Sequence, residues 1–177
     1  MTTENFNIDQ LISTDAHQLH QFMVENNERL RKFFPLTLSS NDTIEKTIAY
    51  IALKEEEIQE KTNFTFAIRE KSTLKIAGLI IIKKIDWTTK KGEFAYCIGA
   101  EFEGKGLTTF AVKELSKFAF DKLDLKTLQI IAHKTNHGSV KVAEKCGFIW
   151  KGILLNEFTP TNEKPLDMEL YELAHEK

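Results

Sequence analysis

The stretch Glu93-Phe-Ala-Tyr-Cys-Ile-Gly-Ala-Glu-Phe-Glu-Gly-Lys-Gly-Leu-Thr-Thr109 decides the fold, because it joins the patterns of a strand, a glycine turn and a helix. Side chains alternate in character from 93 to 98, which predicts a β-strand. From Leu107 onward, apolar residues recur at helical spacing through Ala119. We therefore expect a strand that leads, through a tight turn, into a helix with one buried face.

The turn itself is Gly104-Lys105-Gly106. Glycine lets the chain reverse sharply and leaves main-chain N–H groups uncovered by a Cβ atom. The first N–H groups of the helix that follows have no partner within it, and the helix dipole places partial positive charge there. The junction thus predicts a binding site for a phosphate or diphosphate.

Length and composition limit the class of protein. With 177 residues, of which 42% are hydrophobic and 28% charged, the chain is expected to form one domain spanning 1–177. A net charge of −2 gives no general attraction to nucleic acid or to an anionic membrane. The first residues lack a signal-peptide pattern, and no apolar run approaches the roughly 20 residues of a membrane span. Two cysteines make neither a disulfide framework nor a zinc site. We expect a cytoplasmic protein without a membrane or nucleic-acid partner.

The periodicity of the rest of the chain predicts an α/β (α+β) domain in which helices flank a mixed central sheet of about seven strands. The apolar run 76–82 is typical of a central strand covered on both faces. A helix between two strands favours parallel pairing of 93–98 with 127–132. The other strands are expected at 6–12, 64–68, 148–155 and 166–173, the last two paired around a turn at 159–162.

The segment 33–38 is expected to be a loop, since a proline at 35 disfavours helix in the residue before it. Its adjacent aromatic residues, Phe33 and Phe34, either pack in the core or line a groove for the substrate, together with Tyr96 from the central stretch. Asp42 and Glu45 fit the capping box of the helix that follows.

Two further interpretations of the glycine turn are open at this point. Gly99-x-x-x-x-Gly104-Lys105 matches most of a P-loop, but Gly106 stands where a P-loop needs Ser or Thr to hold magnesium. The dinucleotide fingerprint fails because Thr109 replaces its third glycine. By itself the turn is weak evidence for any one ligand.

A second motif, Asn136-x-x-Ser139 followed by Glu144-Lys145-x-Gly147-Phe148, comes after a strand and about 30 residues beyond the turn. Together with Tyr96-x-x-Gly99 and the stretch 103–109, it resembles the GNAT superfamily of N-acetyltransferases, and within it the RimJ/RimL-like ribosomal-protein N-terminal acetyltransferases. The resemblance covers residues 8–173 and implies a single GNAT-like domain.

The resemblance implies acetyl-CoA as the co-substrate and no metal. The diphosphate would lie on the main chain of Gly104, Lys105, Gly106, Leu107, Thr108 and Thr109. The pantetheine arm would run beside Cys97, Ile98 and Gly99, and Asn136 would form a hydrogen bond with it. In many family members Gln or Arg stands where this chain has Glu101. We expect this difference to weaken the binding of acetyl-CoA without abolishing it. His133 and His137 lack the H-E-x-x-H pattern of a zinc helix.

Catalytic roles follow from the same resemblance. Main-chain N–H groups near Cys97 and Ile98 would polarise the thioester carbonyl. Glu93 would accept the amine proton as general base; the alternative is a surface salt bridge with Lys90 or Lys91.

A tyrosine general acid common in the family is replaced here by Ala143. Ser139 is therefore the candidate that stabilises the departing thiolate, unless it serves only as a helix cap or a cofactor contact. Cys97 and Cys146 have no adjacent base that would make either of them a nucleophile.

The acceptor is expected to be a primary amine. At pH 7 an α-amine with a pKa near 8 is roughly a tenth neutral, whereas a lysine is below about 0.1% neutral. A protein N-terminus, in line with the ribosomal-protein acetyltransferases, is thus the first expectation. Two alternatives remain open: an acceptor that is a polyamine, an amino acid or an antibiotic, and a non-catalytic regulator that binds acyl-CoA. Because relatives in the family often pair, a homodimer is a further possibility.

Overall fold

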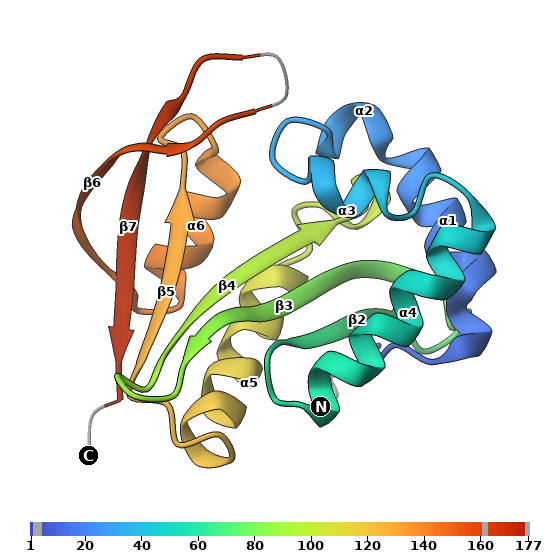
Figure 1. The fold of residues 1–177 in the computed structure, drawn as a ribbon, viewed down its shortest axis with the longest axis horizontal. Helices are drawn as coiled ribbons and strands as arrows, with labels where there is room; N and C mark the ends of the chain where they lie inside the picture. The colour runs from blue at the N-terminus through green and yellow to red at the C-terminus, as the bar shows by residue number, and fades with distance from the viewer. Residues whose placement is uncertain (2–4, 161–162, 176–177) are drawn as a thin grey trace. The chain divides into compact units, whose positions relative to one another are not determined.

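The computed structural model of the protein describes residues 1, 5–160 and 163–175. Seven strands form a mixed sheet in the order β1-β2-β3-β4-β5-β7-β6, with helices alongside (Figure 1). The predicted mixed sheet of about seven strands is confirmed. Within the described ranges, no helix has the length and apolarity that a membrane span requires.

The strands are β1 (Phe6–Gln10), β2 (Phe64–Glu70), β3 (Ile76–Asp86), β4 (Lys91–Ile98), β5 (Thr127–Ala132), β6 (Ile149–Phe158) and β7 (Leu166–Ala174). The α-helices are α1 (Ala16–Glu25), α2 (Asn27–Leu30), α3 (Pro35–Ser39), α4 (Ile44–Gln59), α5 (Leu107–Asp121) and α6 (His137–Lys145). Two short 3-10 helices are η1 (Ser13–Asp15) and η2 (Ala100–Phe102).

The chain forms two compact units, and each is described by itself. Unit 1 contains residues 1–81 and 96–107, and unit 2 contains residues 82–95 and 108–177. The strands β3 and β4 contribute residues to both units.

In unit 1, β1 pairs antiparallel with β2, from Phe6 opposite Glu70 to Gln10 opposite Phe66. Helices α1 and α4 pack against each other, and α4 also packs against β2. The inward side chains of α1 and α4, among them Leu19, Met23 and Ile51, form an apolar core together with Leu79 of β3 and Cys97 of β4. The apolar faces of the helices and strands in this unit therefore pack into one core.

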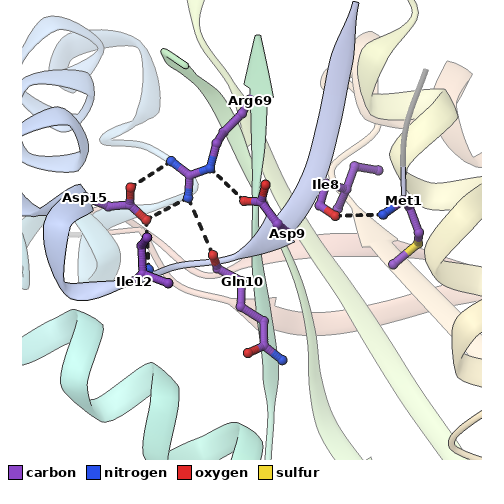
Figure 2. Close-up of polar contacts among 7 residues, drawn as sticks. All are labelled: Met1, Ile8, Asp9, Gln10, Ile12, Asp15 and Arg69. Atoms are coloured by element: carbon purple, nitrogen blue, oxygen red, sulfur yellow. Dashed lines mark hydrogen bonds and ion pairs between the residues drawn. The ribbon is translucent and has the colours of Figure 1, made fainter. Parts of the chain in front are cut away.

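A buried arginine ties three elements of unit 1 together (Figure 2). The Arg69 guanidinium on β2 donates from Nε to Asp9 Oδ1 on β1 at 2.6 Å. It also donates from both terminal nitrogens to Asp15, at 2.8 and 2.6 Å. Asp15 Oδ2 accepts a further bond from the main-chain N–H of Ile12 at 2.8 Å. The network thus fixes the start of α1 to the edge of the sheet.

In unit 2, β4 pairs parallel with β5, with Glu93 opposite Gln129, which confirms the predicted crossover. Strand β7 pairs antiparallel with both β5 and β6, and α6 packs against β5. The β6–β7 hairpin ends the sheet, and its turn at 159–162 lies partly outside the described residues (Figure 1). The outer strand β6 exposes four large apolar side chains: Ile149, Trp150, Ile153 and Leu155.

Two local predictions in unit 1 were wrong. The expected loop at 33–38 is partly helical, because Pro35 begins α3 at its first position, where a fixed φ and a missing N–H cost little. The cap of α4 is Thr43, whose Oγ1 accepts from Lys46 N at 3.3 Å, and not Asp42. Asp42 instead pairs with Lys46 Nζ at 2.8 Å, so its side chain is turned to the helix surface.

Candidate active site

The glycine turn has the backbone that an anion site requires. Gly104 and Gly106 have φ values of +74° and +75°, in the left-handed region that side chains disfavour. A Cβ built on either glycine would meet nothing within 4 Å, so the space beside the turn is open. Helix α5 begins directly after it, at Leu107. The turn therefore fits a diphosphate bound by main-chain N–H groups.

The end of β4 lies tightly against β3 within unit 1. The main-chain N–H of Gly99 donates to the carbonyl of Ala77 at 2.7 Å, so this N–H is already used. A Cβ added to Gly78 would clash with the main-chain carbonyl of Cys97. Gly78 therefore permits the close approach of the two strands beside Cys97 and Ile98. Gly78 was not among the predicted site residues, because it lies inside an apolar run without a turn signal.

Two acidic residues precede the turn, and each has a basic partner from elsewhere in unit 1. Glu101 forms an ion pair with Lys75, and Glu103 forms one with Arg29. The hydrogen bond with Glu101 is the main cause that raises the pKa of Lys75. The negative charge of Glu101, which stands where many family members have Gln or Arg, is thus balanced by the nearby Lys75. The sequence offered no signal for either pair, because their members lie 26 and 74 positions apart.

Asn26 holds the segment before the turn in place. Its side chain is 8% exposed, accepts from the main-chain N–H of Ala100 at 3.0 Å, and donates to the carbonyl of Phe22 at 2.9 Å. Asn26 also separates α1 from α2. Both of its side-chain groups are used, which is how a buried amide is normally accommodated.

Glu93 belongs to unit 2, where it is 7% exposed and ion-paired. Its carboxylate contacts Lys83 Nζ at 2.8 Å and Lys84 Nζ at 3.0 Å. The salt bridge predicted with Lys90 or Lys91 was wrong: Glu93 is buried, and Lys90 pairs with Asp124.

Lys84 belongs to the same cluster of charges. Burial acts to lower its pKa, but its contacts with Glu93 and Glu157 outweigh burial and raise it overall. A charged ammonium group therefore stands beside the carboxylate of Glu93.

Asn136 and Ser139 lie together at the start of α6. Asn136 caps the helix, with its side-chain oxygen accepting from the main-chain N–H of Ser139 at 3.2 Å. The interpretation of Ser139 as the cap was therefore wrong, because Asn136 has that role. Ala143, at the position of the family's tyrosine, is fully buried. The helix ends before Gly147, whose φ of +83° fits the glycine expected there.

The two thiols are poor nucleophiles. Burial raises the pKa of Cys97 to about 12 and that of Cys146 to about 11. Cys146 Sγ also donates to the carbonyl of Thr109 at 3.4 Å, within unit 2. A thiol must lose its proton to attack, so these environments disfavour a cysteine nucleophile.

Within the described residues, His133 and His137 belong to no cluster of potential metal ligands. His133 Nδ1 instead lies 2.7 Å from Thr135 Oγ1. Across residues 1, 5–160 and 163–175, no three His, Cys, Asp or Glu side chains are grouped so as to hold a metal ion.

The three aromatic candidates belong to unit 1. Phe34 is half-buried and packs against the apolar core. Lys32 Nζ lies over the aromatic ring of Phe33, 5.8 Å from the ring centroid. Tyr96 is half-buried on β4.

The family profile described as "Acetyltransferase (GNAT) domain" matches residues 5–149. The chain therefore belongs to the GNAT acetyltransferase family and is an acetyl-CoA-dependent N-acetyltransferase. The resemblance to RimJ/RimL-like enzymes is confirmed. The Bacillus subtilis (strain 168) protein described as "Putative ribosomal N-acetyltransferase YdaF" is 32% identical over 151 residues, or 84% of this chain and 80% of that protein.

A spermidine N(1)-acetyltransferase of Escherichia coli (strain K12) is 35% identical over 82 residues, which cover 46% of this chain and 44% of that protein. Two solved structures share the fold. The ribosomal-protein-S5-alanine acetyltransferase of Vibrio fischeri has a TM-score of 0.93 at 21% identity, covering 100% of this chain and 97% of that one. The microcin C7 self-immunity acetyltransferase MccE, solved with acetyl-CoA and AMP, has a TM-score of 0.88 at 22% identity, covering 98% and 94%.

Proposed function

We propose that this enzyme transfers the acetyl group of acetyl-CoA directly to the N-terminal α-amine of a protein, with a ribosomal protein as the first candidate. The observation that carries the proposal is the match over most of the chain to a relative named for ribosomal N-acetylation. The chemistry agrees, because an α-amine is far more often neutral at pH 7 than a lysine amine.

In this proposal the diphosphate of acetyl-CoA binds the main chain from Gly104 through Thr109. The two left-handed glycines and the open space beside them support that placement. The pantetheine arm follows Cys97 and Ile98 and passes Gly99, whose N–H is already bonded to the carbonyl of Ala77. Asn136 donates from its amide nitrogen, because its oxygen caps α6.

The chemical step needs a base and a stabilised leaving group. The amine nitrogen attacks the thioester carbon, the C–S bond breaks, and the amine loses a proton. Glu93 takes up that proton directly or through water, in the orientation that Lys83 and Lys84 impose on its carboxylate. Main-chain N–H groups near Cys97 and Ile98 stabilise the oxyanion. Ser139 hydrogen-bonds the departing thiolate, a role that the buried Ala143 cannot fill.

The acceptor groove is proposed to include Phe33, Phe34 and Tyr96 of unit 1. A second acceptor class, a polyamine, is favoured by the match of 82 residues to a spermidine acetyltransferase. The hypothesis of a non-catalytic regulator is set aside, because the chain belongs to an enzyme family.

We further propose that residues 1–177 act as a single N-acetyltransferase domain in the cytoplasm. The family match supports the first part, because residues 5–149 take in both compact units. A homodimer is also proposed. The apolar side chains exposed on the outer strand β6 are consistent with pairing, and a related spermidine acetyltransferase of Vibrio cholerae is described as dodecameric. Light scattering after gel filtration would measure the oligomeric state.

The test is release of free coenzyme A from acetyl-CoA in the presence of candidate amines. The panel contains peptides matching the N-termini of ribosomal proteins, the same peptides with blocked α-amines, spermidine and an aminoglycoside. We expect turnover with free N-termini and none with the blocked peptides. A preference for spermidine would instead support a polyamine as the acceptor. Turnover with none of these amines, despite acetyl-CoA binding, would contradict both.

A further inference from the structure

Arg29 spans the segment that joins the end of β4 to the glycine turn, and all of these residues belong to unit 1. Its Nη1 donates to the carboxylate of Glu103, and its Nη2 donates to the main-chain carbonyl of Ile98. Ile98 is the last residue of β4, and Glu103 directly precedes Gly104. The guanidinium therefore contacts both ends of the segment that leads into the turn.

The contacts of Arg29 leave it able to bind another anion. A guanidinium has five N–H donors, and these two bonds use only two of them. The side chains of Arg29 and Glu103 are 34% and 55% exposed, so water reaches both partners. Exposed ion pairs of this kind are weak. A diphosphate offers more charge and several oxygens, and the planar fork of arginine can bind phosphate through two parallel bonds.

Both acidic residues that precede the turn are balanced by a cation. Glu101 and Glu103 would repel an anion that approaches the turn. Lys75 neutralises Glu101, and Arg29 is the partner of Glu103. Arg29 also acts on the end of β4: burial raises the pKa of Cys97, and the charge of Arg29 opposes that rise. Its positive charge is therefore effective at the place where the turn and the strand meet.

We propose that Arg29 is a ligand of the diphosphate of acetyl-CoA, and that it exchanges Glu103 for phosphate oxygens when the co-substrate binds. Its bond to the Ile98 carbonyl holds the guanidinium beside the turn during this exchange. The inference rests on the proposed function, in which Gly104–Thr109 hold the diphosphate. It adds a side-chain ligand, from a helix remote in sequence, to a site otherwise made of main chain.

Truncated donors test this role directly. Acetyl-CoA carries the diphosphate, whereas S-acetylpantetheine lacks it but keeps the reacting arm. In Arg29→Met we expect kcat/KM for acetyl-CoA to fall about 10- to 100-fold, the range of a charged hydrogen bond. The value for S-acetylpantetheine should change less than about twofold, and Arg29→Lys should recover part of the loss. Lys46→Met is the matched control, since Lys46 forms a surface ion pair of unit 1, with Asp42.

A double-variant cycle separates binding of phosphate from neutralisation of Glu103. Glu103→Gln should tighten acetyl-CoA binding, measured by calorimetry, because it removes the competitor of the phosphate. Arg29→Met combined with Glu103→Gln should stay weak. Recovery of wild-type affinity in the double variant, or an equal loss with both donors in Arg29→Met, would overturn the role of Arg29. Failure of the unchanged protein to bind acetyl-CoA would instead overturn the proposed function on which the inference rests.

Discussion

Arg69 and Asp15, from β2 and η1, form a two-point ion pair at 2.8 and 2.6 Å, with the arginine 7% and the aspartate 5% exposed. Asp9 binds the remaining side of the guanidinium (Figure 2). Three charges are thus held at the edge of the sheet through paired hydrogen bonds. This arrangement makes the start of α1 depend on a single side chain of β2.

Replacing Arg69 with Met should destabilise the protein by about 3–5 kcal/mol, because the buried Asp15 carboxylate would lose its partner. Chemical denaturation followed by circular dichroism measures this change. Arg69→Lys should be destabilised less, but still clearly, since lysine cannot bind two carboxylate oxygens in parallel. A loss below about 1 kcal/mol for Met, the level of an exposed pair, would contradict the network's structural importance.

Alanine at Gly104 or Gly106 should weaken acetyl-CoA binding more than it weakens the fold. Each backbone is left-handed, which costs a residue with a Cβ about 1–2 kcal/mol, although the space is open. The strain would relax by rotating the N–H groups away from the diphosphate. Calorimetry should then show at least about tenfold weaker binding.

Gly152→Ala is the control for these glycine variants, because Gly152 also has positive φ and open space but lies on β6. It should lose stability without losing affinity for acetyl-CoA. Equal affinity losses in all three variants would show that binding does not depend on the turn.

Glu93→Gln should lower kcat by about 10²- to 10⁴-fold while leaving acetyl-CoA binding nearly unchanged, as expected for loss of a general base. Single-turnover assays and calorimetry separate the two effects. Glu157→Gln is the matched control, because it removes a carboxylate 3.7 Å from Lys84 that is not on β4. A full rate in Glu93→Gln would show that the buried carboxylate serves only to pair the two lysines.

Both thiols should react slowly with iodoacetamide. With its pKa raised by burial from 9.0 to about 11, Cys146 is about 0.1% thiolate at pH 8, against about 10% for an ordinary thiol. Alkylation followed by mass spectrometry should thus be about a hundredfold slower than in the unfolded chain. Cys97 should be slower still.

The same pKa shifts predict the pH dependence of stability. In each case the folded pKa lies above the ordinary value. The protonated thiols therefore favour the folded state below about pH 9, and this contribution is lost as the pH rises toward 12. In the alkylation experiment, rapid reaction of Cys97 with iodoacetamide at pH 8 in the folded protein would contradict the burial of this thiol.

Patterns local in the chain determined most of the fold. Periods of two and 3.6 located strands and the long helices, because each period records which side of an element is buried, and a continuous apolar run located β3. A helix between two strands determined their parallel pairing. Gly104-Lys105-Gly106 determined a left-handed turn before α5, since glycine alone adopts that backbone cheaply.

The tertiary structure decided which side chains meet. Arg29 and Glu103 lie 74 positions apart, and Arg69 and Asp15 lie 54 apart, so no local period relates them. The alternative salt bridge of Glu93 was likewise assigned to its sequence neighbours Lys90 or Lys91, whereas the partners are Lys83 and Lys84 on β3. Periodicity reports the burial of one element at a time, whereas an ion pair depends on the distance between two elements, which only their packing sets.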